Sequence, residues 1–283
     1  MEHATTQDLH IYPIKIEDDA LNTVDKYPLL PIPFFLTILG RVKAGKSTLL
    51  NSLTLSPRFY GDDFQIKILI SPTARSDPAM KHIIEHFQFV FEEYSEELLD
   101  EIIEMVENDE HGDRYLLVLD DAITTNFKQS KNGRVDAFSA LATKYRHIKN
   151  HYTDKEGNLS IILTLQYFKF LSVITRTMSM GLIIAGEMSD RELGKIAEAY
   201  DFFGGNEKVF LENYRKCRQG QFDFCFLNVD AMEMRKNFDE VIWSREKSKL
   251  SSNDTNRNEQ EEKEEKGNKI ELKMTEKNKE QDD

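Results

Sequence analysis

The chain has 283 residues, of which 40% are apolar and 10% aromatic, and its formal net charge is −13. This length is enough for one large domain or two small domains with a sizeable core. The charge excludes a globally basic nucleic-acid binder. It leaves room for a local basic loop or a ring pore, because binding follows the distribution of charge rather than its sum.

The chain has the features expected of a soluble intracellular protein. It begins with the polar segment MEHATTQDLH, which lacks the apolar stretch of a signal peptide. The most apolar segment, LLPIPFFLTILG, is too short and too interrupted by proline to span a bilayer. Cys217 and Cys225 are expected to be small core hydrophobes rather than a disulfide framework. We therefore expect no membrane partner.

Strands and helices alternate from residue 31 to residue 243, which predicts one α/β domain with a mostly parallel central sheet flanked by helices. Residues 1–30 are expected to be an N-terminal arm, and residues 244–283 a disordered charged tail, because that tail has too little apolar content to offset ordering. The predicted strands are 34–39, 65–70, 115–121, 159–166, 181–186 and 221–230. The predicted helices are 46–53, 78–87, 95–108, 135–150, 190–200 and 206–217.

The segment GRVKAGKS, which follows the first strand, fits the Walker A pattern G-x-x-x-x-G-K-[ST]. Backbone N–H groups of such a loop, and of the helix after it, surround phosphate oxygens. Lys46 would place a charge at the β- and γ-phosphates, and the Ser47 hydroxyl would bind Mg²⁺. Lys43 stands where many such loops have Gly or Asn, so backbone strain is expected there. The predicted nucleotide-binding residues are Gly40, Arg41, Val42, Lys43, Ala44, Gly45, Lys46, Ser47 and Thr48.

Two carboxylates end the buried strand YLLVLDD. As a Walker B site, Asp120 would hold Mg²⁺ through water, and Asp121 would polarise the attacking water as a general base. The alternative is an acidic pair that caps the following helix. The P-loop upstream favours the metal site, because Mg²⁺ in such loops takes a second ligand from a neighbouring strand.

Two further polar residues follow the next strand. Gln166 ends LSIILTLQ, where its amide would reach the γ-phosphate or the attacking water; the alternative is an ordinary strand-end glutamine. Arg176, in VITRTMS, is a candidate transition-state cation for its own or a neighbouring subunit, and the alternative is a surface arginine. Together with Lys46 and Asp121, these residues form the predicted catalytic set.

The identity of the nucleotide depends on elements beyond the loop. The helix start KSTLLNSL resembles that of a small or dynamin-like GTPase. A GTPase would also carry N/T-K-x-D for guanine and D-x-x-G for the γ-phosphate, and neither is in the expected place. The LSGGQ-like signature of an ABC-type ATPase is also missing. These observations favour ATP, with Mg²⁺, over GTP.

The order of the motifs resembles the poxvirus A32-like genome-packaging ATPases of the FtsK–HerA branch. The resemblance spans about residues 34–243 and rests on the P-loop, ILISPTARSDP, LLVLDD, KYRHIKN, IILTLQYFKF and ITRTMSMGLII. It implies a RecA-like P-loop ATPase in which Asp120 and Asp121 form Walker B, Gln166 senses the γ-phosphate and Arg176 is the arginine finger. It also implies a homo-oligomeric ring that moves double-stranded DNA into a preformed viral capsid, with a capsid or portal partner, in the virion or the host-cell cytoplasm.

Contacts to DNA would go to phosphates and would be independent of sequence. The basic candidates are Lys144, Arg146, His147, Lys149 and Lys169. The alternative for the first four is a helix C-terminus, which favours cations.

The leading hypothesis is thus an ATP-driven DNA-packaging motor. The first alternative is a dynamin-like or regulatory GTPase, and the second is a non-catalytic P-loop scaffold for virion assembly.

Overall fold

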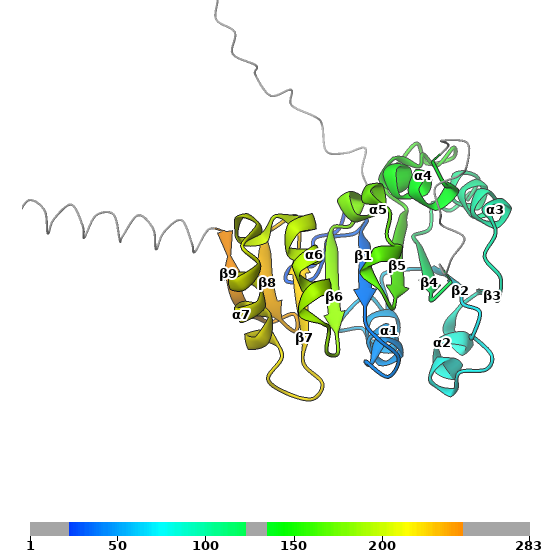
Figure 1. Cartoon of the computed structure of the whole chain (residues 1–283). Helices are drawn as coiled ribbons and strands as arrows, with labels where there is room; N and C mark the ends of the chain where they lie inside the picture. Colours follow the sequence, from blue (N-terminus) through cyan, green and yellow to red (C-terminus); the bar gives the residue numbers. More distant parts are fainter. Residues whose placement is uncertain (1–22, 123–134, 246–283) are drawn as a thin grey trace, which may run out of the picture.

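A nine-stranded sheet forms the centre of the protein in the computed structural model, which describes residues 23–122 and 135–245 (Figure 1). The strand order is β3-β2-β4-β5-β1-β6-β7-β8-β9. The first six strands in that order are parallel, and the last three pair antiparallel. The strands are β1 Phe35–Leu39, β2 Ile66–Ile70, β3 Phe89–Phe91, β4 Tyr115–Asp120, β5 Leu159–Leu165, β6 Gly181–Ala185, β7 Phe224–Asn228, β8 Glu233–Lys236 and β9 Glu240–Ser244.

The helices connect the parallel strands in two directions. The connections from β1 to β2 and from β2 to β3 run toward one edge of the sheet, and those from β3 through β4 and β5 to β6 run back. Because such crossovers are right-handed, α1 and α2 cover one face, and α3, α4 and α5 the other. The helices are α1 Lys46–Leu55, α2 Lys81–His86, α3 Glu96–Glu107, α4 Ala137–Lys144, α5 Val173–Met178, α6 Asp190–Tyr200 and α7 Glu207–Cys217. Short 3-10 turns are η2 Pro78–Met80, η3 Tyr145–His147, η4 Phe168–Phe170 and η5 Phe202–Gly205.

Local sequence accounts for the helix starts. In α3 the Ser95 hydroxyl accepts a hydrogen bond from Leu98 N at 3.1 Å, which satisfies one of the amides left free at a helix N-terminus. Apolar residues of α3 repeat at helical spacing and are buried, while its carboxylates face outward. The predicted mostly parallel α/β sheet and the amphipathic helix at 95–108 are confirmed.

Several boundaries differ from the prediction. The helix expected at 135–150 ends at Lys144 and continues as η3, and the three-residue strand β3 was not predicted. Leu29 and Leu30, which the sequence assigns to the arm, lie in the core, and the Tyr60 hydroxyl donates to the Leu30 carbonyl at 2.9 Å. The core therefore begins before residue 31.

The rest of the predicted arm (1–22) and the predicted tail from residue 246 lie outside the described residues. β9 includes Ser244, so the sheet extends one residue beyond the predicted domain end. Within 23–122 and 135–245, no helix has the length and apolar character needed to cross a membrane.

Candidate functional site

The P-loop lies at the carboxyl end of β1, between β5 and β6. Gly40 N donates to the Leu165 carbonyl at 3.0 Å, which ties the start of the loop to β5. Gly45 has φ +92° and Lys43 has φ +65°, so both lie in the left-handed region. A lysine is strained in this region because its Cβ approaches the following carbonyl, and the strain predicted at Lys43 is confirmed.

The other flank of the loop packs against the end of β6. A Cβ on Gly40 would lie 2.8 Å from the Ala185 carbonyl oxygen. A Cβ on Gly186, which has φ +72°, would lie 2.7 Å from the Ala44 Cβ. Both glycines are needed here because the P-loop and the end of β6 approach too closely for side chains.

Three of the predicted catalytic side chains meet beside the loop. The Lys46 ammonium lies 3.5 Å from an Asp121 carboxylate oxygen and donates to the Gly40 carbonyl at 2.9 Å. The Gln166 amide donates to the same Asp121 oxygen at 3.2 Å. Lysine, carboxylate and amide therefore form a connected group from three neighbouring strand ends, those of β1, β4 and β5. Such a group can bind a terminal phosphate and orient a water next to it.

Asp120 is buried and held by hydroxyl groups from both neighbouring strands. Thr164 on β5 donates to one carboxylate oxygen at 2.6 Å, and Ser71, after β2, donates to the other at 3.1 Å. Burial raises the pKa of Asp120, while the hydrogen bond from Thr164 opposes this rise. The Thr164 hydroxyl also accepts from the Asp121 backbone N–H at 3.1 Å, and Asp121 has φ +45°. One threonine thus orients both acidic residues.

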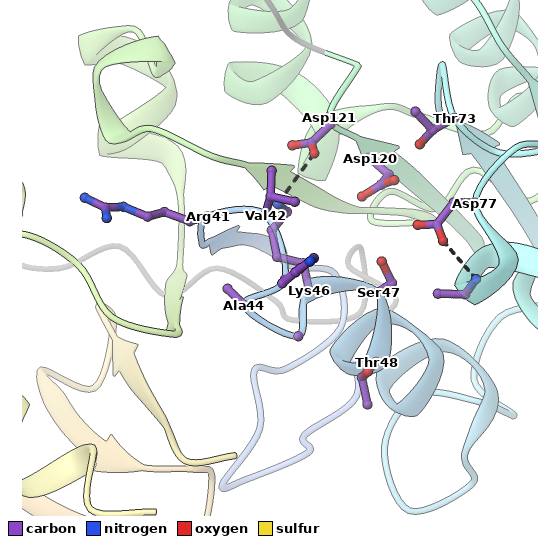
Figure 2. Close-up of a pocket in the computed structure, with 13 residues that line it drawn as sticks. Arg41, Val42, Ala44, Lys46, Ser47, Thr48, Thr73, Asp77, Asp120 and Asp121 are labelled. Carbon is purple, nitrogen blue, oxygen red and sulfur yellow. Dashed lines mark hydrogen bonds and ion pairs between the residues drawn. The ribbon is translucent and has the colours of Figure 1, made fainter. Parts of the chain in front are cut away.

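The P-loop, Asp120 and Asp121 border an open cleft of about 470 Å³, which we call the phosphate cleft (Figure 2). Figure 2 shows the Asp120 carboxylate and the Ser47 hydroxyl on the same side of the cleft, with the Arg41 side chain pointing away from them. The cleft is lined by Arg41, Val42, Lys43, Ala44, Gly45, Lys46, Ser47, Thr48, Thr73, Asp77, Ala79, Asp120 and Asp121. Gly40 and Gln166 contact lining residues without lining the cleft themselves.

Sequence reasoning missed the contribution of the loop after β2. Thr73 and Asp77 line the cleft, and Ser71 holds Asp120. The Asp77 carboxylate also accepts from Ala79 N at 2.9 Å, which fixes its position. The available signal was a row of polar residues, SPTARSD, directly after a buried strand, but only the pairing of β2 with β4 brings them to the site.

Arg176 is not among the residues that line the phosphate cleft. Its guanidinium carbon lies 4.3 Å from the centre of the Phe168 ring, and one guanidinium nitrogen donates to the Phe168 carbonyl at 3.3 Å. Its Nε is buried without a hydrogen-bond partner among the described residues. Within one chain, Arg176 therefore contacts the segment that follows Gln166 and not the phosphate site.

The basic candidates for DNA contact are only partly grouped. The His147 ring nitrogen Nδ1 lies 3.0 Å from the Glu156 carboxylate, and the Lys149 ammonium lies 2.7 Å from the Asp154 carboxylate, so each of these residues has an acidic neighbour. Arg146 lies over the Tyr145 ring, and Lys144 is in the last turn of α4. Lys169 belongs to η4, with its ammonium 5.4 Å from the ring centres of Tyr167 and Phe170. Asp154 and Glu156 therefore reduce the net positive charge that the sequence predicts around residues 144–149.

The fold of the chain is that of solved P-loop NTPases. The sequence matches no protein-family model and no curated protein. The structure is similar to the genome packaging NTPase B204 from Sulfolobus turreted icosahedral virus 2 in complex with ATP-gammaS, at TM-score 0.51 and 15% identity over 75% of this chain and 98% of that one. B204 in complex with AMP gives TM-score 0.51 and 16% identity, and in complex with AMPPCP 0.50 and 15%, each over 72% of this chain and 96% of that one. The predicted P-loop NTPase fold is confirmed.

Proposed function

We propose that this chain is a P-loop ATPase that cleaves the γ-phosphate of ATP. The observation that carries the proposal is the contact of Lys46, Asp121 and Gln166 beside the P-loop. In the proposed reaction, Lys46 binds the transferring phosphate. Asp121 accepts a proton from the attacking water, and Gln166 orients that water or the γ-phosphate.

The donor set fits Mg²⁺. Described residues provide no group of three or more His, Cys, Asp or Glu side chains that could hold a metal alone. A P-loop magnesium site does not need one, because Mg²⁺ binds through one or two protein oxygens, substrate phosphates and water. Ser47 is the proposed direct ligand and the buried Asp120 carboxylate would hold the ion through water, and the ion would neutralise charge on the phosphates.

We further propose that hydrolysis drives double-stranded DNA into a viral capsid. Support comes from the likeness of the fold to B204, a genome packaging NTPase, and from the resemblance found in the sequence. A homo-oligomeric ring, a capsid or portal partner and a location in the virion or the host-cell viral factory belong to the same proposal. DNA contacts through Lys144, Arg146, His147, Lys149 and Lys169 remain the prediction for its binding surface.

The role of Arg176 as the transition-state cation stays a prediction. Because it does not line the cleft of its own chain, its proposed action is on the nucleotide of a neighbouring subunit. Mixing Arg176→Ala with Lys46→Ala subunits tests this, since a shared site would regain activity in mixed assemblies. If the mixture is no more active than the separate variants, Arg176 has another role.

The decisive experiment compares ATP hydrolysis by the full chain with and without duplex DNA. A DNA-packaging ATPase should be stimulated by duplex DNA, and Lys46→Ala should abolish the turnover. Hydrolysis that persists in Lys46→Ala would contradict the site assignment. A complete lack of turnover with DNA present would instead favour the non-catalytic scaffold.

The alternative function is a dynamin-like or regulatory GTPase, favoured by the segment GRVKAGKSTLLNSL. Binding of ATP and GTP to the purified chain separates the two functions. A strong preference for GTP would contradict the motor proposal.

A further inference from the structure

A second hollow lies beside the segment that follows β6, on the side of β1 away from Asp120 and Asp121. This side cleft has a volume of about 230 Å³ and is lined by Glu187, Met188, Asp190, Leu193, Tyr214, Arg215 and Arg218. The Tyr214 hydroxyl donates to the Gly186 carbonyl at 2.9 Å. Gly186 in turn lies so close to Ala44 that an added Cβ would be 2.7 Å from the Ala44 Cβ. Tyr214 and Gly186 therefore connect the side cleft to Ala44 of the P-loop.

The strand order sets the direction in which a bound nucleotide extends. The γ-phosphate end is defined by Asp121 and Gln166, which follow β4 and β5 on one side of β1. On the other side of β1 lies β6, and the segment directly after β6 forms one wall of the side cleft. A nucleotide with its γ-phosphate beside Asp121 can extend its nucleoside part across the P-loop toward this wall.

The residues of the side cleft suit a ribose and a base. The carboxylates of Glu187 and Asp190 can accept hydrogen bonds from ribose hydroxyls, and guanidinium groups stack on flat rings. Arg215 lies 3.4 Å from the Asp190 carboxylate, and both residues line the cleft. Arg218 donates to the Asp223 carbonyl, while its Nε is buried without a hydrogen-bond partner in the part of the chain that the structure describes.

We propose that the side cleft binds the nucleoside part of the nucleotide whose phosphates occupy the P-loop. The proposal rests on the proposed function, since it requires a nucleoside triphosphate in the phosphate cleft. Glu187 and Asp190 bind the ribose, and Arg215 contacts the base. The contact between Gly186 and Ala44 keeps the two clefts in a fixed relation.

The first test compares binding of ATP and inorganic tripolyphosphate, which lacks the nucleoside, to the full chain. Arg215→Glu should weaken ATP binding about fivefold, the scale of a lost stacking contact, and change tripolyphosphate binding less than about twofold. Lys216→Glu is the matched control, because it makes the same charge change on the same helix and does not line the side cleft. Equal effects of the two variants on ATP, or equal loss of both ligands in Arg215→Glu, would overturn the proposal.

The second test locates the base directly by photolabelling with 8-azido-ATP and mass spectrometry. Label should be found in residues 187–190 or 214–218, and competition by ATP should remove it. Label confined to other segments overturns the nucleoside placement. If Lys46→Ala still weakens both ATP and tripolyphosphate in that case, the proposed ATPase stands and only the side-cleft assignment fails. If wild type binds neither ligand, the proposed function fails first.

Discussion

Replacing Gly186 by alanine should weaken nucleotide binding although this residue does not line the phosphate cleft. The new Cβ would lie 2.7 Å from the Ala44 Cβ, whereas ordinary contact begins at 3.4 Å, so the P-loop and the end of β6 must separate by about 0.7 Å. The Ala44 segment carries backbone amides predicted to bind phosphate. The loss of one such charge-assisted hydrogen bond costs about 1.5–3 kcal/mol, which corresponds to about 10- to 100-fold weaker binding.

The effect of backbone strain at residue 186 must be distinguished from the effect of displacing the P-loop. Gly186 has φ +72°, so alanine there also costs about 1 kcal/mol of stability. Gly204→Ala is the matched control, because Gly204 has φ +63° but no atom lies within 4 Å of its added Cβ. The strain alone should lower Tm by about 2–4 °C in both variants, and only Gly186→Ala should also weaken ATP binding.

A second substitution tests the contact itself. In Gly186→Ala combined with Ala44→Gly, the atom at 2.7 Å is removed and the nearest remaining atom of residue 44 is its Cα at 3.2 Å. Isothermal titration with ATP and with tripolyphosphate should show recovery of binding in the double variant. Wild-type affinity in Gly186→Ala, or an equal loss in Gly204→Ala, would refute the reasoning.

Three other predictions concern the site residues. Lys43→Gly should raise the free energy of unfolding by about 0.5–1 kcal/mol in urea titrations, because it relieves the left-handed φ of +65°; an unchanged or lower value would contradict this. Asp120→Asn should abolish turnover yet stabilise the nucleotide-free chain. Burial raises the pKa of Asp120, so ionising this carboxyl in the folded chain costs stability. The cost is fully present above the raised folded-state pKa, and it disappears as the pH falls toward the ordinary pKa of 3.8. The stability advantage of Asp120→Asn should therefore be larger at pH 8 than near pH 4, and a pH-independent difference would count against a buried charge. Gln166→Ala should lower kcat by about 10²- to 10³-fold with ATP affinity nearly unchanged, while the exposed Gln219→Ala serves as control; a normal kcat would remove Gln166 from the reaction.

The sequence by itself identified the candidate site residues that directly follow the end of a single strand. A glycine-rich turn followed by Lys46 and Ser47, an acidic pair after four apolar residues, and Gln166 after a buried strand were all recognised from local pattern. Alternation of strands and helices implies parallel pairing, and parallel pairing brings successive carboxyl ends to one edge of the sheet. For these reasons Lys46, Asp121 and Gln166 could be assigned to one catalytic set from a one-dimensional pattern, and the structure shows that the three side chains contact one another.

Only the tertiary structure decided the contacts that depend on strand order. Ser71 reaches Asp120 because β2 pairs with β4, and Gly186 meets Ala44 because β6 pairs with β1. No local pattern encodes these pairings, since each joins segments far apart in the chain. The same is true of Arg176, whose position after β5 suggested a catalytic cation but whose guanidinium packs on Phe168 within its own chain. A sequence motif specifies the chemistry of a side chain, and the packing of the helix that carries it determines what that side chain contacts.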